Sequence, residues 1–121
     1  VTGIRNQKIS DIRNRLNIID STDNCVFVSI HQNYFEQSKY SGAQVFYSGN
    51  NADSEKLADA VQNSIVQSLQ NDNTRKIKKA DKTLYLLYNA QKPAIMVECG
   101  FMSNEAEADK LKNEDKRKFF Y

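Results

Sequence analysis

The sequence predicts an α/β fold, a three-layer sandwich in which helices flank a mostly parallel sheet. Apolar runs of strand length alternate along the chain with segments whose apolar residues recur at helical spacing, the pattern of helices packed on a sheet. The chain has 121 residues, 40% of them hydrophobic and 26% charged, which is close to the norm for one packed domain. No internal repeat or low-complexity segment divides it.

The first half of the chain predicts a helix followed by two strands. The helix is expected to begin at Ser10, which can cap it, and to end near residues 20–24. Its apolar stripe comprises Ile9, Ile12, Leu16 and Ile19. The apolar, β-branched run "CVFVSI" at residues 25–30 is typical of a strand covered on both faces. A second strand, "AQVFY" at residues 43–47, follows Gly42.

The longest helix is predicted after the second strand. Asp53 is expected to cap it, and Glu55 is well placed against the positive end of its dipole. Apolar residues repeat there at every fourth position, at Leu57, Val61, Ile65 and Leu69. The helix is expected to stop at "NDN", residues 71–73, and the basic segment at residues 75–82 is expected to be a loop.

Two further strands and a helix complete the prediction. The strands are "LYLLY" at residues 84–88 and "AIMVE" at residues 94–98, the latter entered through Pro93, which is tolerated at the start of a strand. A last helix is expected over residues 104–111, where an asparagine followed three residues later by a glutamate resembles a capping box.

The composition argues against two classes of function, nucleic-acid binding and membrane spanning. The net charge is only +2 and charges of both signs are interspersed, which argues against a nucleic-acid surface. No apolar run approaches the roughly 20 residues of a membrane span. Cys25 and Cys99 lie in or beside apolar stretches and are expected to be buried thiols. The chain does not begin with Met, so a leader or anchor could still have preceded Val1.

Polar side chains follow two of the predicted strands. His31, the single histidine, comes just after one strand, and Glu98 ends the apolar part of another. If these strands are parallel neighbours, both side chains emerge at the same edge of the sheet. An imidazole there suits metal ligation or proton transfer. A carboxylate beside "AIMV" would be partly desolvated, which raises its pKa and favours a general-base role.

These residues also have structural interpretations. A histidine at a strand end is often a hydrogen-bonded or surface residue, and Glu98 could instead cap a turn or pair with a lysine. A thiol hydrolase with Cys99 as nucleophile and His31 as base is a further alternative, although no nucleophile elbow or helix N-terminus surrounds Cys99. Spacing alone leaves these alternatives open.

The segments "SIHQN" and "VECGFMSN" together resemble the zinc-dependent N-acetylmuramoyl-L-alanine amidases, which act on bacterial peptidoglycan. The resemblance extends over nearly the whole chain and includes "SDIRNRLNIID", "SGAQVFYSG", "SEKLADAVQNSI" and "KTLYLLYNAQKPAIMVECGFMSNEAEADKL". "SGAQVFYSG" and "LYLLYNAQKPAIMVE" look closest to the germination-specific, spore-cortex branch, whose members help make muramic-δ-lactam.

The resemblance implies a site and a reaction. In this family two histidines and a glutamate hold the zinc, and a second glutamate works on the metal-bound water that hydrolyses the amide between N-acetylmuramic acid and L-alanine. Residue by residue, His31 carries over as a zinc ligand and Glu98 as the catalytic carboxylate. Gln32 and Asn33 are candidates for substrate binding. Asn33 could also orient His31, and a turn-stabilising role is the favoured alternative for it.

The chain departs from the family at its beginning. The family's first ligand histidine stands in an Asp-Pro-Gly-His-Gly-Gly stretch on the first strand, and the ligand glutamate on the helix that follows; this chain contains neither stretch. Residues 1–121 are therefore expected to be the C-terminal two-thirds of the catalytic domain, without its first strand and helix. The remaining zinc ligands, a His and a Glu, are expected upstream of Val1. An inactive fragment or a non-catalytic cell-wall-binding module is the alternative.

The resemblance also implies surroundings and partners. The expected substrate is peptidoglycan in the cell wall or spore cortex, outside the cytoplasm, with secretion or anchoring through a segment not present here and possible dependence on an activator protein. Independently of the resemblance, Arg13 or Arg15 could anchor the first helix by pairing with an acid, and neither is assigned a catalytic role. The basic segment at residues 75–82 could attract stem-peptide carboxylates, although a solvated loop is favoured. Aromatic residues that could stack on sugar rings or simply pack are Tyr34, Phe35 and Tyr40.

Overall fold

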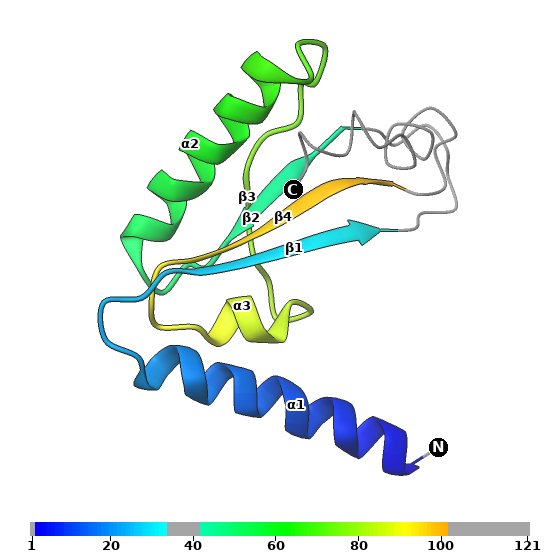
Figure 1. Cartoon of the computed structure of the whole chain (residues 1–121), viewed down its shortest axis with the longest axis vertical. Helices are drawn as coiled ribbons and strands as arrows, with labels where there is room; N and C mark the ends of the chain where they lie inside the picture. The colour runs from blue at the N-terminus through cyan, green and yellow to red at the C-terminus, as the bar shows by residue number, and fades with distance from the viewer. Residues whose placement is uncertain (1, 34–41, 102–121) are drawn as a thin grey trace.

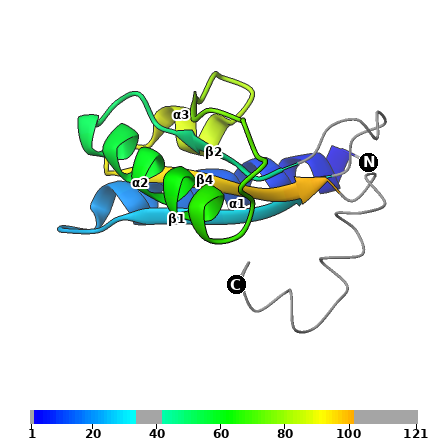
Figure 2. The same ribbon diagram turned by 90° about the horizontal axis from the view of Figure 1, so that it is seen from above.

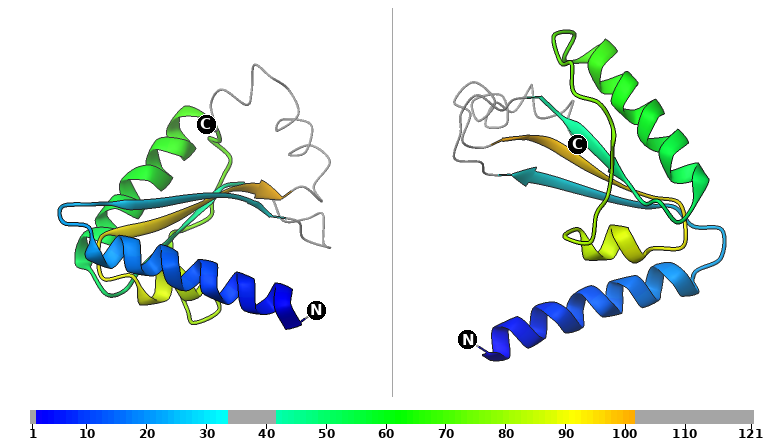
Figure 3. Two further views of the ribbon diagram at one scale, coloured as in Figure 1. Left: turned by 60° about the horizontal axis from the view of Figure 1, so that its bottom comes forward. Right: turned by 180° about the vertical axis from the view of Figure 1, so that it is seen from behind.

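A sheet between two helical layers forms the body of the molecule (Figure 1). The computed structural model describes residues 2–33 and 42–101. Helix α2 (Ala52–Ser68) covers one face of the sheet, and helices α1 (Thr2–Ser21) and α3 (Tyr85–Asn89) cover the other (Figures 2 and 3). The predicted α/β sandwich is thus confirmed.

The sheet has four strands in the order β1-β4-β2-β3. Their bounds are β1 Phe27–Asn33, β2 Gln44–Tyr47, β3 Lys78–Lys79 and β4 Ala94–Phe101. β1 runs parallel to β4 and β2 runs parallel to β3, whereas β2 is antiparallel to β4. The sheet is therefore mixed, with two parallel pairings among those described. The short strand β3 also corrects the prediction that residues 75–82 form only a loop.

Alternate residues of β4 build two apolar cores. Ala94 and Met96 pack on the side of α1 and α3, whereas Ile95 and Val97 pack on the side of α2. The first core also receives Leu16, Ile19, Phe27, Phe46, Leu84 and Leu87, and the second receives Val45, Leu57, Ala58, Val61 and Ile65. β4 is thus the central element, buried on both faces as its continuous apolar run indicates.

The run predicted as a third strand is helix α3 instead. Its buried residue Leu87 lies opposite Tyr85 and Tyr88, which are three positions apart and both about half exposed. A turn starts the helix, because Asp81 Oδ1 accepts a hydrogen bond from the backbone N–H of Thr83 at 2.9 Å and another from its hydroxyl. The spacing of the two tyrosines was a helical signal that the apolar character of the segment obscured.

Two helix boundaries also differ from the prediction. α1 begins at Thr2, well before Ser10. The cap of α2 is Asn51, whose side chain accepts a hydrogen bond from the backbone N–H of Asp53 at 3.0 Å, so Asp53 lies in the first turn of the helix. The helix predicted over residues 104–111 lies outside the described residues.

β1 is covered on one face only, which contradicts the prediction for residues 25–30. Val26, Val28 and Ile30 are 50–57% exposed, whereas the alternate residues point toward α1 and α3. β1 is an edge strand of the described sheet, and α2 packs over β2 and β4 rather than over β1. Among the described helices, none has both the length and the apolar character needed to cross a bilayer.

Candidate functional site

His31 and Glu98 are direct neighbours on adjacent parallel strands. The register of β1 and β4 pairs the Cα atoms of these two residues. Side chains paired in this way point to the same face of a sheet, and both residues continue the rows that face α1 and α3. The convergence that the strand pattern predicted is therefore observed. His31 is exposed, whereas Glu98 is only 1% exposed.

The pairing of the two strands becomes irregular just beyond this pair. Asn33 of β1 pairs with Phe101 of β4, so β4 advances by three residues where β1 advances by two. An extra residue of this kind is a β-bulge, a feature that re-aims side chains and is frequent beside active sites. The register of β4 against β1 thus shifts between Glu98 and Phe101.

A third polar residue extends the row, and the sequence patterns did not predict it. Gln44 of β2 pairs with Glu98 from the side opposite His31. Its amide is held at both ends: Arg75 Nη2 donates to Gln44 Oε1 at 2.6 Å, and Gln44 Nε2 donates to the carbonyl of Lys76 at 2.8 Å. Glu98 therefore lies between an imidazole and a fixed carboxamide on three neighbouring strands. Only the strand order brings Gln44 to this position.

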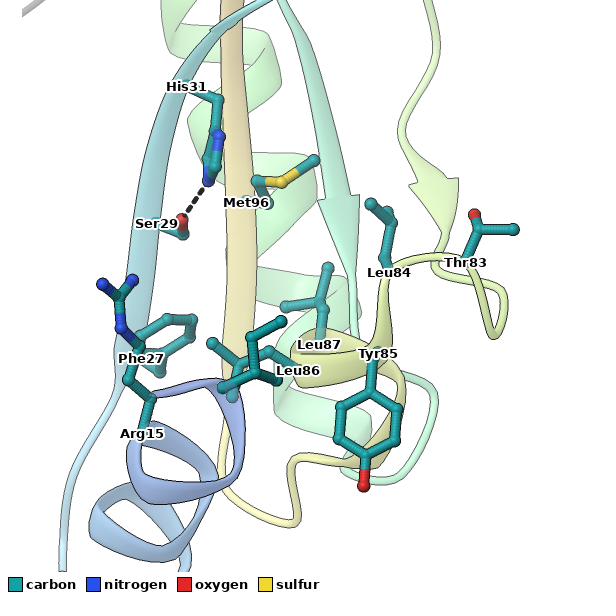
Figure 4. Close-up of a pocket in the computed structure, with 11 residues that line it drawn as sticks. Arg15, Phe27, Ser29, His31, Thr83, Leu84, Tyr85, Leu86, Leu87 and Met96 are labelled. Carbon is teal, nitrogen blue, oxygen red and sulfur yellow. Dashed lines mark hydrogen bonds between the residues drawn. The ribbon is translucent and has the colours of Figure 1, made fainter. Parts of the chain in front are cut away.

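A pocket of about 260 Å³ opens beside His31, where α1, α3, β1 and β4 meet (Figure 4). Its floor is apolar and includes Phe27, Leu87 and Met96. His31 Nε2 lies 2.8 Å from Ser29 Oγ, and both side chains line the pocket. The imidazole is therefore oriented by a hydroxyl of its own strand and faces a hollow that can admit a ligand.

The donor set at this edge is consistent with part of a zinc site. Imidazole and carboxylate are donors that zinc takes, and a catalytic zinc normally has three protein ligands. Within residues 2–33 and 42–101, no group of three or more His, Cys, Asp or Glu side chains could hold a metal ion. His31 thus supplies a donor of suitable chemistry beside the carboxylate of Glu98, but the described residues do not make a complete ligand set.

Cys99 belongs to the other face of the sheet. Together with Ile30 and Val97 it lines a separate pocket that also involves residues of α2. Burial, and secondarily the charge of Glu98, raise the pKa of its thiol to about 11. A buried, protonated thiol that is separated from His31 by the sheet is not an activated nucleophile. The alternative of a Cys99–His31 thiol hydrolase is therefore wrong.

The other candidate residues have varied surroundings. Gln32 is exposed on β1, and Asn33 is described only through its backbone pairing with Phe101. In the basic segment, Arg75 Nη1 donates to the carbonyl of Gly42 at 3.4 Å. The aromatic candidates Tyr34, Phe35 and Tyr40 lie outside the described residues.

The pairing predicted for the first helix is present. Arg15 Nη2 lies 3.0 Å from Asp11 Oδ2, one helical turn away. Arg15 also lines the pocket beside His31, a position that the sequence did not predict.

The fold and the paired residues place this chain among α/β proteins whose polar site lies at the carboxyl edge of parallel strands. A family model described as N-acetylmuramoyl-L-alanine amidase matches residues 1–120. The chain therefore belongs to the N-acetylmuramoyl-L-alanine amidase family, as its motifs indicated.

Two curated relatives are from Bacillus subtilis (strain 168). The germination-specific N-acetylmuramoyl-L-alanine amidase is 38% identical over 109 residues, which are 90% of this chain and 45% of that protein. The amidase LytC is 28% identical over 109 residues, which are 88% of this chain and 21% of LytC. The higher identity to the germination-specific enzyme agrees with the branch that the motifs suggested.

Solved structures give the same fold. The CwlD amidase of Clostridioides difficile, in complex with the GerS lipoprotein, matches with a TM-score of 0.87 and 38% identity, over 96% of this chain and 58% of CwlD. AmiC2 of Nostoc punctiforme matches with a TM-score of 0.76 and 27% identity, over 89% of this chain and 58% of AmiC2. The chain thus spans less than two thirds of the length of these relatives.

Proposed function

We propose that residues 1–121 are the C-terminal part of a zinc-dependent amidase domain, and that the complete protein hydrolyses the amide between N-acetylmuramic acid and L-alanine in peptidoglycan. The observation that carries this proposal is the direct pairing of His31 with Glu98 on parallel strands beside a pocket. Membership of the amidase family supports the reaction class.

His31 would be one of three protein ligands of the zinc, the other two being a His and a Glu outside this chain. The hydrogen bond between His31 Nε2 and Ser29 Oγ would orient the imidazole, as neighbours of ligand histidines commonly do. When bound, zinc would polarise the scissile carbonyl and bring the pKa of a coordinated water toward ~7.

Glu98 would move the proton. Its side chain is only 1% exposed and stands on β4, the strand that pairs with both β1 and β2. It would accept a proton from the attacking water as the new C–O bond forms, and then deliver that proton to the alanine nitrogen as the C–N bond breaks. Gln44, fixed by Arg75, would help to hold β2 in place beside the carboxylate.

The relatives also support proposals for substrate and partners. The identity to a germination-specific amidase supports spore-cortex peptidoglycan as the substrate and an extracytoplasmic location. CwlD is a lipoprotein-bound amidase, which supports an activator protein for this chain as well. Gln32 and Asn33 would contact the glycan or the peptide from the end of β1.

The test uses the natural protein that contains this chain, with Glu98→Gln and His31→Ala variants. Hydrolysis is measured as new L-alanine amino groups released from peptidoglycan, and zinc per protein by elemental analysis. Glu98→Gln should lower kcat at least 10²- to 10⁴-fold with zinc content retained, because it removes the proton acceptor but keeps the shape. His31→Ala should lower zinc content as well as activity.

The matched control is Glu55→Gln, which removes an exposed carboxylate from the first turn of α2. This variant should retain both zinc and activity. Full activity in Glu98→Gln would contradict the proposal. Binding of peptidoglycan without release of amino groups by the wild-type protein would favour the non-catalytic wall-binding module instead.

A further inference from the structure

Arg15 places a positive charge at the mouth of the pocket beside His31. Its side chain extends from α1 past Phe27 toward Ser29 (Figure 4). It is 63% exposed, so that its guanidinium is open to solvent and to a ligand that enters the pocket. The guanidinium of Arg15 can therefore contact a ligand that binds beside His31.

The ion pair of Arg15 does not prevent this role. The contact with Asp11 joins two exposed side chains one helical turn apart, and such pairs contribute only about 0.3–0.5 kcal/mol. A guanidinium has five N–H donors in a planar fork, so one carboxylate neighbour does not use them all. A ligand carboxylate can therefore share or replace Asp11 at little cost.

The rest of the pocket selects the kind of anion. Among the lining residues that the structure describes, Arg15 carries the one permanent charge, and the residues of the floor are apolar. This combination suits a ligand that carries a carboxylate next to a small apolar group, because the apolar part is buried while the charge meets the fork at the mouth. A stem peptide offers that combination in its alanine and the acidic residue after it.

We propose that Arg15 binds a stem-peptide carboxylate close to the scissile amide and makes the amidase selective for substrates in which that carboxylate is free rather than amidated. This inference rests on the proposed function, since it assigns His31 and the stem peptide to the same pocket. Arg15 is thereby a specificity residue on a helix that carries no part of the proton transfer.

The test measures binding of two synthetic stem tripeptides to the zinc-loaded natural protein by calorimetry. The tripeptides differ only in a free carboxylate or a carboxamide on the residue after alanine. The free acid should bind the wild type about tenfold more tightly, as expected for one hydrogen-bonded charge pair. The ratio should fall to about one in Arg15→Gln and stay intermediate in Arg15→Lys, which keeps the charge but loses the fork.

Arg13→Gln is the matched control, because it removes the same charge from the same helix at an exposed position. It should leave the tenfold ratio intact. Equal affinity of the two peptides for the wild type, no measurable binding of the free acid, or an unchanged ratio in Arg15→Gln would overturn the inference.

The hydrolysis assay separates this inference from the proposed function. A wild-type protein that releases amino groups but shows no Arg15-dependent preference retains the function and loses the carboxylate site. A protein with the preference but without hydrolysis retains the site and loses the proposed reaction.

Discussion

Replacement of Gln62 by leucine should destabilise the protein, because this buried residue of α2 completes the edge of β2. Among the described strands, β3 pairs only with the last two residues of β2, and none pairs with the edge before them. Gln62 Oε1 accepts from the backbone N–H of Val45 at 2.9 Å, and Gln62 Nε2 donates to the carbonyls of Ala43 at 3.1 Å and Arg75 at 3.3 Å. The side chain of Gln62 thus makes hydrogen bonds to this edge of the sheet that the backbone of a neighbouring strand would otherwise make.

The expected loss follows from these contacts. In Gln62→Leu the N–H of Val45 loses its side-chain acceptor, and a buried donor left in this way costs about 1–3 kcal/mol. The carbonyl of Ala43 keeps its bond from Asn73 Nδ2 at 2.8 Å, so its loss is smaller, about 0.5–1 kcal/mol. Leucine gains roughly 1 kcal/mol from its additional apolar surface. The net destabilisation should be about 2 kcal/mol.

Urea denaturation of the natural protein measures this difference. With a slope of about 2 kcal/mol per molar urea, the midpoint should fall by about 1 M. Gln67→Leu, at an exposed position on the same helix, is the control and should shift the midpoint by less than about 0.3 M. Equal shifts in the two variants would refute the interpretation that Gln62 completes the sheet edge.

Two further predictions concern Cys99 and two glycines. Because the pKa of Cys99 is raised from 9.0 to about 11, its thiol stabilises the folded state fully below pH 9, and this contribution is lost as the pH rises to 11. The stability difference between wild type and Cys99→Ala in urea should therefore shrink by up to about 3 kcal/mol between pH 8 and pH 11, and a constant difference would contradict the shift. Gly42→Ala should lower stability by about 1–3 kcal/mol, because Gly42 has φ +90° and a new Cβ would lie 2.8 Å from Asn73 Cγ. Gly49→Ala, where the Cβ would meet the flexible end of Lys79, should cost less than about 1 kcal/mol in the same melts.

The sequence predicted the elements whose patterns are local and strong. It correctly identified the apolar runs that form β1, β2 and β4. It also identified α2 from the apolar residue at every fourth position. It failed where an apolar run was short, because four or five apolar residues fit a strand or a buried helical turn equally well. This is why α3 was predicted as a strand. The prediction that β1 is covered on both faces was also wrong. The burial of β1 depends on which strands α2 packs against, and the sequence pattern does not show this.

The candidate site was predictable only in part, for a related reason. His31 and Glu98 could be placed at one edge because two parallel strands deliver their ends to the same side. Gln44 and Arg15 could not be placed, because their positions depend on strand order and on the packing of α1. In the sequence, Arg15 precedes Leu16 of the apolar stripe, so the tilt of the helix decides whether it faces the pocket or the solvent.

The division of roles between the two strands follows from their places in the sheet. β4 is paired on both sides, so Glu98 stands on an element whose position is fixed by β1 and β2 together. Under the proposed function Glu98 would transfer a proton from this fixed position, and a small displacement from the reacting atoms would cost much of the rate. His31 stands on β1, at the edge of the described sheet, where, under the proposed function, the ligand residues outside this chain would approach the zinc without displacing β4. The central strand β4 thus carries the buried Glu98, and the edge strand β1 carries the exposed His31.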